Sequence, residues 1–316
     1  MENSIRLGIS TCLLGENVRF DGGHKHDRFL TDTLGQYAEY VPVCPEVECG
    51  LGVPREAMRL VGDPASPRLV TTHTGRDMTD RMLAWAHARV VELERENLYG
   101  FIFKRGSPSS GMERVRVYND QGMPSLQGVG LFARTFMEHF PLLPVEEDGR
   151  LNDPLLRENF IERIFALKRW REVAAERRSR SDLIDFHTRQ KLLILSHSPK
   201  HYQAMGQLVA GQKGLPVNDL FGKYQALLME ALKLKATARK HANVLMHMVG
   251  YFKKELAPDE KKELLDLIET YRKGYVPLVV PITLMNHYVR KYDEAYLKTQ
   301  TYLSPHPVEL QLRNHA

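Results

Sequence analysis

Apolar and polar positions follow two different patterns along this chain. In the first half, short apolar runs predict β-strands over Ile5–Ser10, Tyr40–Val43 and Tyr99–Lys104. Between these runs, helical spacing of apolar residues predicts helices over Asp27–Tyr37, Asp77–Glu96 and Val129–Phe140. Alternation of strands and helices is typical of a parallel sheet covered by helices on both faces. We therefore expect an α/β domain with a Rossmann-like parallel sheet.

The pattern changes near residues 145–152. Asp153-Pro154 supplies a helix cap followed by a proline at the first helical position. Helical spacing then predicts helices over Pro154–Arg177, Ser181–Ser196, Pro199–Ala210, Val217–Leu234, Ala236–Leu256, Pro258–Lys273, Ile282–Lys291 and Glu294–Leu303. We therefore divide the chain into an α/β domain over residues 1–148 and an all-helical domain over residues 149–316.

Chemically capable side chains follow three of the expected strands. Cys12 comes just after the first strand, Cys44 ends the second, and a Ser107–Ser110 loop follows the third. In an open α/β sheet, ligands bind outside the carboxyl ends of the strands. These three segments should therefore converge on one crevice, although they are far apart in the sequence.

The chain contains three cysteines, Cys12, Cys44 and Cys49. A free cysteine is commonly a small buried apolar residue, and that interpretation stays open, most of all for Cys12. No histidine stands near these cysteines at zinc-finger spacing. Three thiolates without a fourth ligand could hold an iron–sulfur cluster with one iron left open.

Length and composition place the chain among ordinary globular proteins. It has 316 residues, which is enough for two domains with substantial cores. No apolar run approaches the roughly 18 residues of a membrane span, and the first residues lack the layout of a signal peptide. An odd number of cysteines does not suggest a disulfide framework. We expect a cytoplasmic protein with reduced thiols and no membrane contact; the oligomeric state is left open.

Charge is divided unevenly between the two halves. Residues 1–150 carry 17 basic and 21 acidic side chains, whereas residues 151–316 carry 27 basic and 18 acidic ones. A net charge of about +9 in the second part suggests a polyanionic partner, although a merely basic helical domain remains an alternative. Basic residues near aromatic ones could meet the phosphates and bases of folded RNA. The candidates for RNA binding are Arg189, Lys191, Arg239, Lys240, Lys253, Lys254, Arg290 and Lys291.

Several motifs together resemble a known family. Cys12-Leu13-Leu14-Gly15, Val43-Cys44-Pro45-Glu46-Val47 and Ser107-Pro108-Ser109-Ser110-Gly111 are similar to the motifs of the thiouracil desulfurase (TudS-type) family. Gly149–Pro154 and Pro281–Asn286 resemble the helical domain that is fused to it in tRNA 4-thiouridine desulfidases of the RudS type. The resemblance covers essentially the whole chain.

The resemblance implies an enzyme with a [4Fe-4S] cluster held by three cysteines. The unligated iron would take the sulfur of a thiolated uracil while water replaces it at the pyrimidine C4, without net redox change. Single-domain members carry the third cluster cysteine at the position of Ser110. Cys49 could replace it, because a five-residue loop would let two thiolates face one cluster; Ser110 as an oxygen ligand, or a degraded cluster, are the alternatives. The expected cluster ligands are thus Cys12, Cys44 and Cys49.

Glu46 and Ser107 match family positions associated with catalysis. A Glu46 carboxyl in an apolar crevice could deprotonate water or protonate the pyrimidine, and Ser107 could position the reacting group. Their alternative roles are a solvated carboxylate and a turn residue before Pro108.

These observations predict a desulfidase that converts 4-thiouridine in tRNA to uridine, with thiolated tRNA as its partner. Three other interpretations remain. The substrate could be free thiouracil or a thionucleoside, the chain could be a non-catalytic tRNA-binding module with zinc or no metal, or a cysteine could act as nucleophile through a persulfide.

Overall fold

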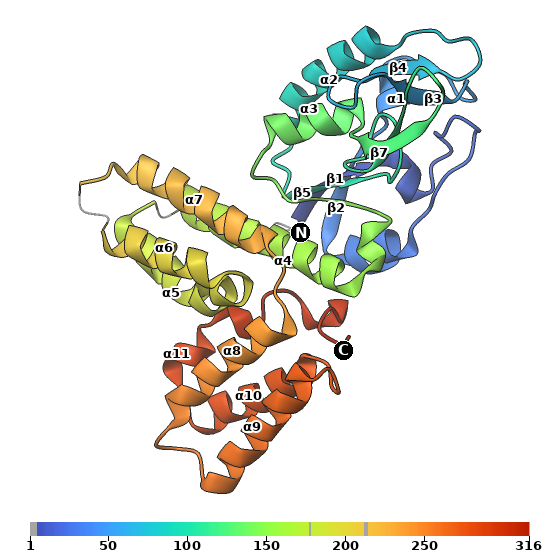
Figure 1. Cartoon of the computed structure of the whole chain (residues 1–316). Coiled ribbons are helices and arrows are strands. Elements are labelled where there is room, and N and C mark those ends of the chain that lie inside the picture. Colours follow the sequence, from blue (N-terminus) through green and yellow to red (C-terminus); the bar gives the residue numbers. More distant parts are fainter. Residues whose placement is uncertain (1–4, 177, 212–213, 316) are drawn as a thin grey trace. The chain divides into compact units, whose positions relative to one another are not determined.

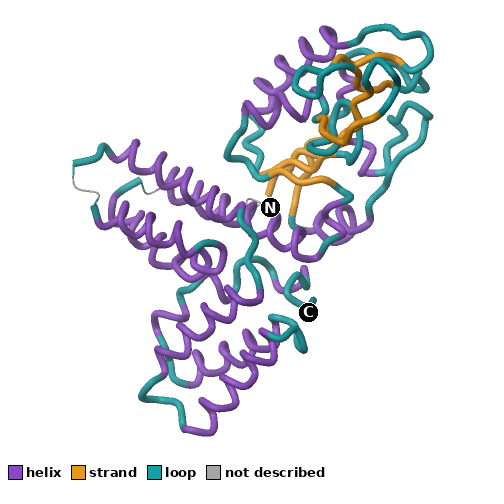
Figure 2. Tube along the Cα trace, viewed as in Figure 1, coloured by secondary structure: helices purple, strands orange, loops and turns teal. Residues whose placement is uncertain are grey.

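The computed structural model of the chain describes residues 5–176, 178–211 and 214–315. The chain divides into two compact units, one ending at Asp153 and the other beginning at Pro154. Figure 2 shows that the described strands lie in the first unit, whereas the second is built from helices. The α/β and all-helical fold classes expected from the sequence are confirmed.

The first unit is built around a four-stranded parallel sheet (Figure 1). Its strands, in spatial order, are β2 (Ala38–Val43), β1 (Ile5–Ser10), β5 (Gly100–Phe103) and β8 (Val145–Glu147). The central strands β1 and β5 are almost wholly buried, as expected where helices cover both faces of a parallel sheet. Gly8 permits this packing, because a Cβ there would clash with the ring of Phe101.

A second four-stranded sheet was not predicted from the sequence. Its order is β4 (Arg68–Thr71), β3 (Met58–Val61), β6 (Val115–Tyr118) and β7 (Pro124–Gly128). The strand β3 pairs parallel with β6, while the two outer pairs are antiparallel. Each strand has only four or five residues, so its apolar alternation is too short to separate from that of a loop.

The helices of the first unit are α1 (Pro45–Glu48), α2 (Thr79–Glu94) and α3 (Leu131–His139). Residues Phe132 and Phe136 of α3 pack on Phe101 and Phe103 of β5, with ring centroids 4.6 Å apart for Phe101 and Phe136. The predicted helix over Asp27–Tyr37 is instead a π-helical turn over Phe29–Thr33 followed by a 3₁₀ turn.

The second unit contains eight helices among its described residues. They are α4 (Pro154–Glu176), α5 (Arg180–His197), α6 (Pro199–Ala210), α7 (Val217–Lys233), α8 (Ala238–Val249), α9 (Pro258–Arg272), α10 (Val279–Lys291) and α11 (Ala295–Lys298). Each predicted helix overlaps one of them. The predicted helices over Ala236–Leu256 and Glu294–Leu303 are longer than α8 and α11. In the structure, separate 3₁₀ turns, Gly250–Phe252 and Thr301–Leu303, follow these two helices.

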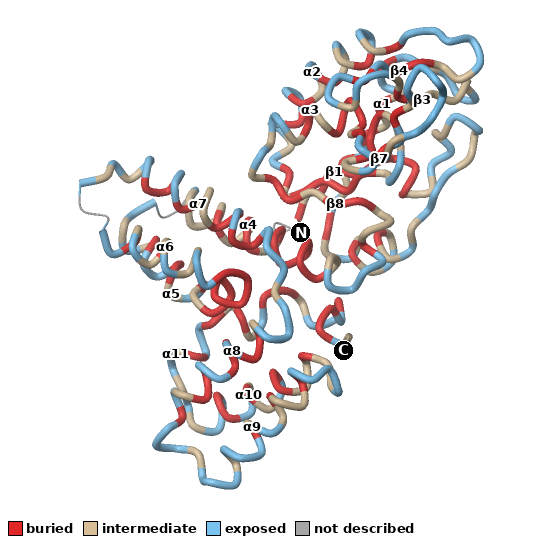
Figure 3. The backbone as a smooth tube through the Cα atoms, in the orientation of Figure 1, coloured by how far each residue is buried: buried red, intermediate tan, exposed pale blue. Residues whose placement is uncertain are grey.

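Aromatic side chains fill part of the core of the second unit. Trp170 is buried and its ring stacks on that of Tyr224, with centroids 5.0 Å apart; Phe186 and Phe221 pack against the same indole. Figure 3 shows buried positions along α4 and α5 as well as along the strands of the first sheet. Among the described residues, no helix has both the length and the apolar character needed to cross a membrane.

Candidate active site

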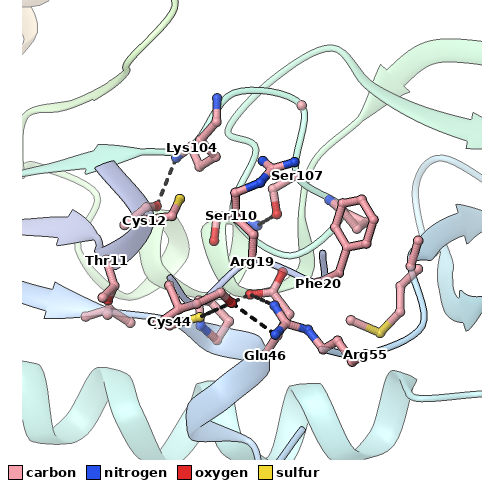
Figure 4. Close-up of a pocket in the computed structure, with 18 of the residues that line it drawn as sticks. Thr11, Cys12, Arg19, Phe20, Cys44, Glu46, Arg55, Lys104, Ser107 and Ser110 are labelled. Atoms are coloured by element: carbon pink, nitrogen blue, oxygen red, sulfur yellow. Dashed lines mark hydrogen bonds and ion pairs between the residues drawn. The ribbon is translucent and has the colours of Figure 1, made fainter. Parts of the chain in front are cut away.

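A cavity of about 300 Å³ lies at the carboxyl ends of β1, β2 and β5. Ser10 of β1 is the register partner of Val43 of β2, so the chain leaves these two strands side by side at Thr11 and Cys44. Cys12, Cys44 and Ser107 all line the cavity, as Figure 4 shows. The parallel sheet therefore brings together the three segments that the sequence predicts to converge.

Two thiols face this cavity. Burial is the main factor that raises the pKa of Cys12 to about 11 and the pKa of Cys44 to about 12. The charge of Cys12 contributes to the raised pKa of Cys44, as expected for neighbouring groups, and Lys104 partly offsets the effect of burial on the pKa of Cys12. Thiolates are the donors that iron–sulfur clusters and soft metal ions use, and binding of such a centre displaces the thiol protons. Cys12 and Cys44 are thus suitable ligands for such a centre.

The third cysteine lies elsewhere. Cys49 does not line the cavity; it belongs to a buried apolar cluster with Leu60, Met78 and Met82. Its Sγ donates to the backbone carbonyl of Glu46, 3.3 Å away. The segment between Cys44 and Cys49 is the helix α1 rather than a loop, and residues five apart on a helix differ by roughly 140° in direction. The structure therefore does not bring Cys49 together with the other two thiols.

Ser110, by contrast, lines the cavity. Its side chain is buried, and its backbone N–H donates to Oγ of Ser107 over 3.1 Å. This is the position at which the resemblance places a third cysteine, and here it presents a hydroxyl to the same cavity as Cys12 (Figure 4).

A chain of hydrogen bonds runs from the serine loop to Glu46. Oγ of Ser107 accepts the N–H groups of Ser109 and Ser110, so its own proton is directed to Oγ of Ser109, 2.9 Å away. Oγ of Ser109 in turn donates to Oε1 of Glu46 over 2.5 Å. The two serines therefore orient the carboxylate and leave its Oε2 oxygen on the side of Cys44 and Arg55. Sequence reasoning did not single out Ser109, because nothing in the sequence distinguishes it from the other serines of the loop. In the structure it is completely buried, and its hydrogen bond to Glu46 defines its role.

Cationic side chains surround the carboxylate and the thiols. Nη2 of Arg55 lies 3.8 Å from Oε2 of Glu46, and its Nη1 donates to the carbonyl of Val18 over 3.0 Å. Nζ of Lys104 lies 2.7 Å from a carboxylate oxygen of Asp148. Arg55 and Lys104 also line the cavity with Arg19 and Arg105. Carboxylates accompany these cations, because Glu46 and Glu56 also line the cavity, Asp148 pairs with Lys104 and Asp21 pairs with Arg19.

Most of the basic residues predicted to bind RNA are exposed in the second unit. Arg189, Arg239, Lys253, Lys254, Arg290 and Lys291 are exposed, whereas Lys191 and Lys240 are half-buried. The ammonium group of Lys240 donates to the carbonyls of His197 and Lys235, so it is engaged within the fold. The neighbouring aromatic residues Phe186, Phe252, Tyr271 and Tyr288 are buried core residues, whereas Tyr251, beside Lys253 and Lys254, is exposed and stacks on Tyr296.

The carboxyl edge of the parallel sheet carries two thiols, an oriented carboxylate and a serine loop. This arrangement is typical of an α/β enzyme domain that binds its ligand at the strand ends. Residues 7–148 match the family model described as 2-thiouracil desulfurase, and residues 191–307 match the model described as protein of unknown function DUF1722. Over 153 residues the chain is 35% identical to the uncharacterized protein YbgA of Escherichia coli (strain K12), and the matched region covers 48% of this chain and 90% of YbgA.

The chain therefore belongs to the family of YbgA, and it joins a 2-thiouracil desulfurase domain to a DUF1722 domain. This confirms the resemblance drawn from the motifs. A solved structure described as the [4Fe-4S]-dependent thiouracil desulfidase TudS is 27% identical and covers 50% of this chain and 100% of its own, with a TM-score of 0.41.

Proposed function

We propose that this protein is a [4Fe-4S]-dependent desulfidase that converts 4-thiouridine in tRNA to uridine. The observation that carries this proposal is the convergence of Cys12, Cys44 and the Ser107–Ser109–Glu46 hydrogen-bond chain on one cavity, within a domain of the 2-thiouracil desulfurase family. Two thiols next to an oriented carboxylate suit a reaction in which sulfur is taken up and water is activated.

Cys12 and Cys44 would hold the cluster, and Ser110 is the side chain in position to serve as the third ligand. Cys49 would require α1 to unwind before its sulfur could reach the cavity. When bound, a cluster with one iron free of protein ligands supplies a thiophilic Lewis acid for the sulfur of a thiolated pyrimidine.

Glu46 is the proposed general base. Its Oε2 oxygen takes a proton from water as the water oxygen bonds to C4 of the pyrimidine, and the C4–S bond then breaks. The carbon retains its oxidation state and the oxygen of water replaces sulfur, so neither an oxidant nor a reductant is needed. The proton on Glu46 and the remaining proton of the water leave with the sulfur as hydrogen sulfide, which returns Glu46 to its carboxylate form. The Ser107–Ser109 chain holds Oε1, and Arg55 stabilises the negative charge near Oε2.

The second domain is the proposed tRNA-binding part. Its charge balance and its exposed basic side chains support contacts to phosphates, which dominate affinity for nucleic acids. A thionucleoside within folded RNA must leave its stack to enter a recessed cavity, as other enzymes that act on bases require.

The decisive experiment compares turnover of thiolated tRNA, free 4-thiouridine and free 2-thiouracil by anaerobically purified protein at low and high salt. We expect turnover of tRNA at low substrate concentration to fall steeply with salt, because counterion release drives binding. Turnover of the free compounds with no activity on tRNA would overturn the tRNA assignment and leave a desulfidase for small thiolated bases. Iron and sulfide contents near zero, with tRNA binding intact, would instead indicate a non-catalytic module.

A further inference from the structure

A second cluster of potential ligands lies inside the helical domain. Glu158 and Glu162 are four residues apart on α4, so they share one face of that helix. A ring nitrogen of His306, in the C-terminal segment, and one carboxylate oxygen of each glutamate all lie within 4.8 Å of one another. All three residues are buried, with relative exposures of 6%, 1% and 8% for Glu158, Glu162 and His306.

Each glutamate uses one oxygen for an arginine and presents the other to an imidazole. Nε of Arg313 lies 3.1 Å from Oε1 of Glu158, and its Nη2 lies 2.9 Å from Oε1 of Glu162. The Oε2 oxygen of Glu162 lies 3.1 Å from Nε2 of His197, and that of Glu158 lies 3.5 Å from Nε2 of His315. The Oε2 oxygens therefore face the imidazole rings of His197 and His315, while Arg313 engages the Oε1 oxygens.

The histidine hydrogen bonds determine which ring nitrogen is available. Nδ1 of His197 lies 2.6 Å from the carbonyl of Leu234, and Nδ1 of His306 lies 3.1 Å from the carbonyl of Pro307. A carbonyl only accepts, so Nδ1 of His306 carries a proton and Nε2 of its neutral ring keeps its lone pair; Nε2 of His197, by contrast, is already engaged by the carboxylate of Glu162. Metal-binding histidines show this arrangement, in which the other ring nitrogen donates to a carbonyl or carboxylate.

His306 provides an observation that an ion-pair network does not explain. Its Nε2 is buried and has no hydrogen-bond partner among the described residues. Arg313 satisfies the glutamates but leaves this nitrogen without a partner, whereas a cation bound among the three ligand atoms would engage all three residues.

We propose that Glu158, Glu162 and His306 bind a divalent transition-metal ion, with His197 holding the carboxylate of Glu162 in place beside them. Mixed imidazole and carboxylate donors favour Zn²⁺ over Mg²⁺ and Ca²⁺, which prefer oxygen ligands alone. The ion would connect the first turns of α4 to the C-terminal segment. This site is separate from the desulfurase site and does not depend on the function proposed for it.

The test measures zinc in the full-length protein after chelator treatment, incubation with Zn²⁺ and removal of the excess. His306→Ala removes a ligand, and His187→Ala is the matched control, because His187 is also buried in this domain with an unpaired Nε2 among the described residues. We expect the wild type and His187→Ala to retain about one zinc more per chain than His306→Ala. Zinc bound at the thiols of the first domain contributes equally to all three proteins and therefore does not affect the difference in zinc content between them.

A second readout separates ligand loss from misfolding. Zn²⁺, but not Mg²⁺, should raise the melting temperature of the wild type and of His187→Ala by more than that of His306→Ala, because a ligand stabilises only a state that binds it. If His306→Ala does not fold, the near-isosteric Glu158→Gln takes its place. Equal zinc contents in the variant and its control, or no zinc bound to the second domain of the wild type, would overturn the proposal.

Discussion

Ser109 is the residue that most changes the interpretation of the desulfurase site. It has no direct place in the expected ligand set, yet its hydroxyl joins Ser107 to the carboxylate of Glu46. Ser107 thus acts on the carboxylate through Ser109, in addition to facing the cavity. Glu46, in turn, is held by a buried hydroxyl rather than by solvent.

Ser109→Ala should lower kcat by about 10- to 100-fold, because the orienting hydrogen bond to a general base is removed while the base itself remains. Iron content should stay at the wild-type level, since Ser109 does not line the cavity. The measurement is desulfuration rate together with iron per chain, with Ser125→Ala on the outer strand β7 as control. An unchanged rate would show that the hydrogen-bond chain has no part in the reaction.

His187 gives the helical domain a specific sensitivity to acid. Burial, aided by Lys191, lowers the pKa of His187 from 6.5 to about 4. Between these values the unfolded chain binds a proton that the folded chain does not, so the free energy of unfolding falls as the pH drops from 6.5 to about 4. His187→Asn, which cannot titrate, should reduce this fall. Denaturant unfolding of both proteins at about pH 7 and about pH 5 tests the prediction, and identical pH dependence would contradict it.

At the level of elements, α1 determines which sulfur atoms reach the cavity. Cys44 precedes the helix and Cys49 follows it, and the carbonyl of Cys49 is held by Nε of Arg81 from α2 over 2.7 Å. The side chain of Cys49 consequently packs into the apolar cluster between α2 and the second sheet. A short helix thus separates two cysteines that look equivalent in the sequence.

Three substitutions test this arrangement in anaerobically reconstituted protein. Cys44→Ala should lose the brown absorbance and most of the iron, Cys49→Ala should keep both, and Ser110→Ala should lower iron retention. As a gain-of-function complement, Ser110→Cys should retain iron more firmly than the wild type, because a thiolate is a better ligand for an iron–sulfur cluster than a hydroxyl. Loss of iron in Cys49→Ala, with the fold intact by circular dichroism, would return Cys49 to the ligand set.

The sequence was sufficient for three strands of the main sheet and for the convergence of their ends, but not for β8, which has only three residues. Short apolar runs identified β1, β2 and β5, longer periodic patterns identified the helices of the second domain, and the rule for parallel sheets then placed Cys12, Cys44 and Ser107 together. The sequence could not determine whether the Cys49 side chain reaches the cavity, because four residues between two cysteines fit a loop and a helical turn equally well. Nor could it identify Ser109 or the His306 cluster, since those depend on tertiary contacts between distant segments.

For the whole molecule, the uneven charge distribution has a measurable consequence. Residues 151–316 carry the positive surplus, and Lys253 and Lys254 are exposed in the turn between α8 and α9. Replacing both by alanine should weaken tRNA binding at low salt and reduce the slope of log affinity against log salt by about 1 for each phosphate that the protein no longer neutralises. Titrations of tRNA at several salt concentrations measure this slope.

Lys291→Ala is the matched control for that experiment, because the ammonium group of Lys291 is paired with the carboxylate of Glu260. Its removal should change the slope less than removal of the Lys253–Lys254 pair. Equal slopes for the wild type and the double variant would place the RNA-binding surface on another face of the domain.

The register between β1 and β2 has a consequence for assembly of the enzyme. The backbone pairing of Ser10 with Val43 sets the spacing of the two thiol-bearing segments. Because this spacing comes from strand pairing, we expect the polypeptide to fold first and to receive its inorganic centre afterwards. Cofactor that is lost on exposure to air should be restored by supplying iron and sulfide to the native protein, with no unfolding and refolding in between.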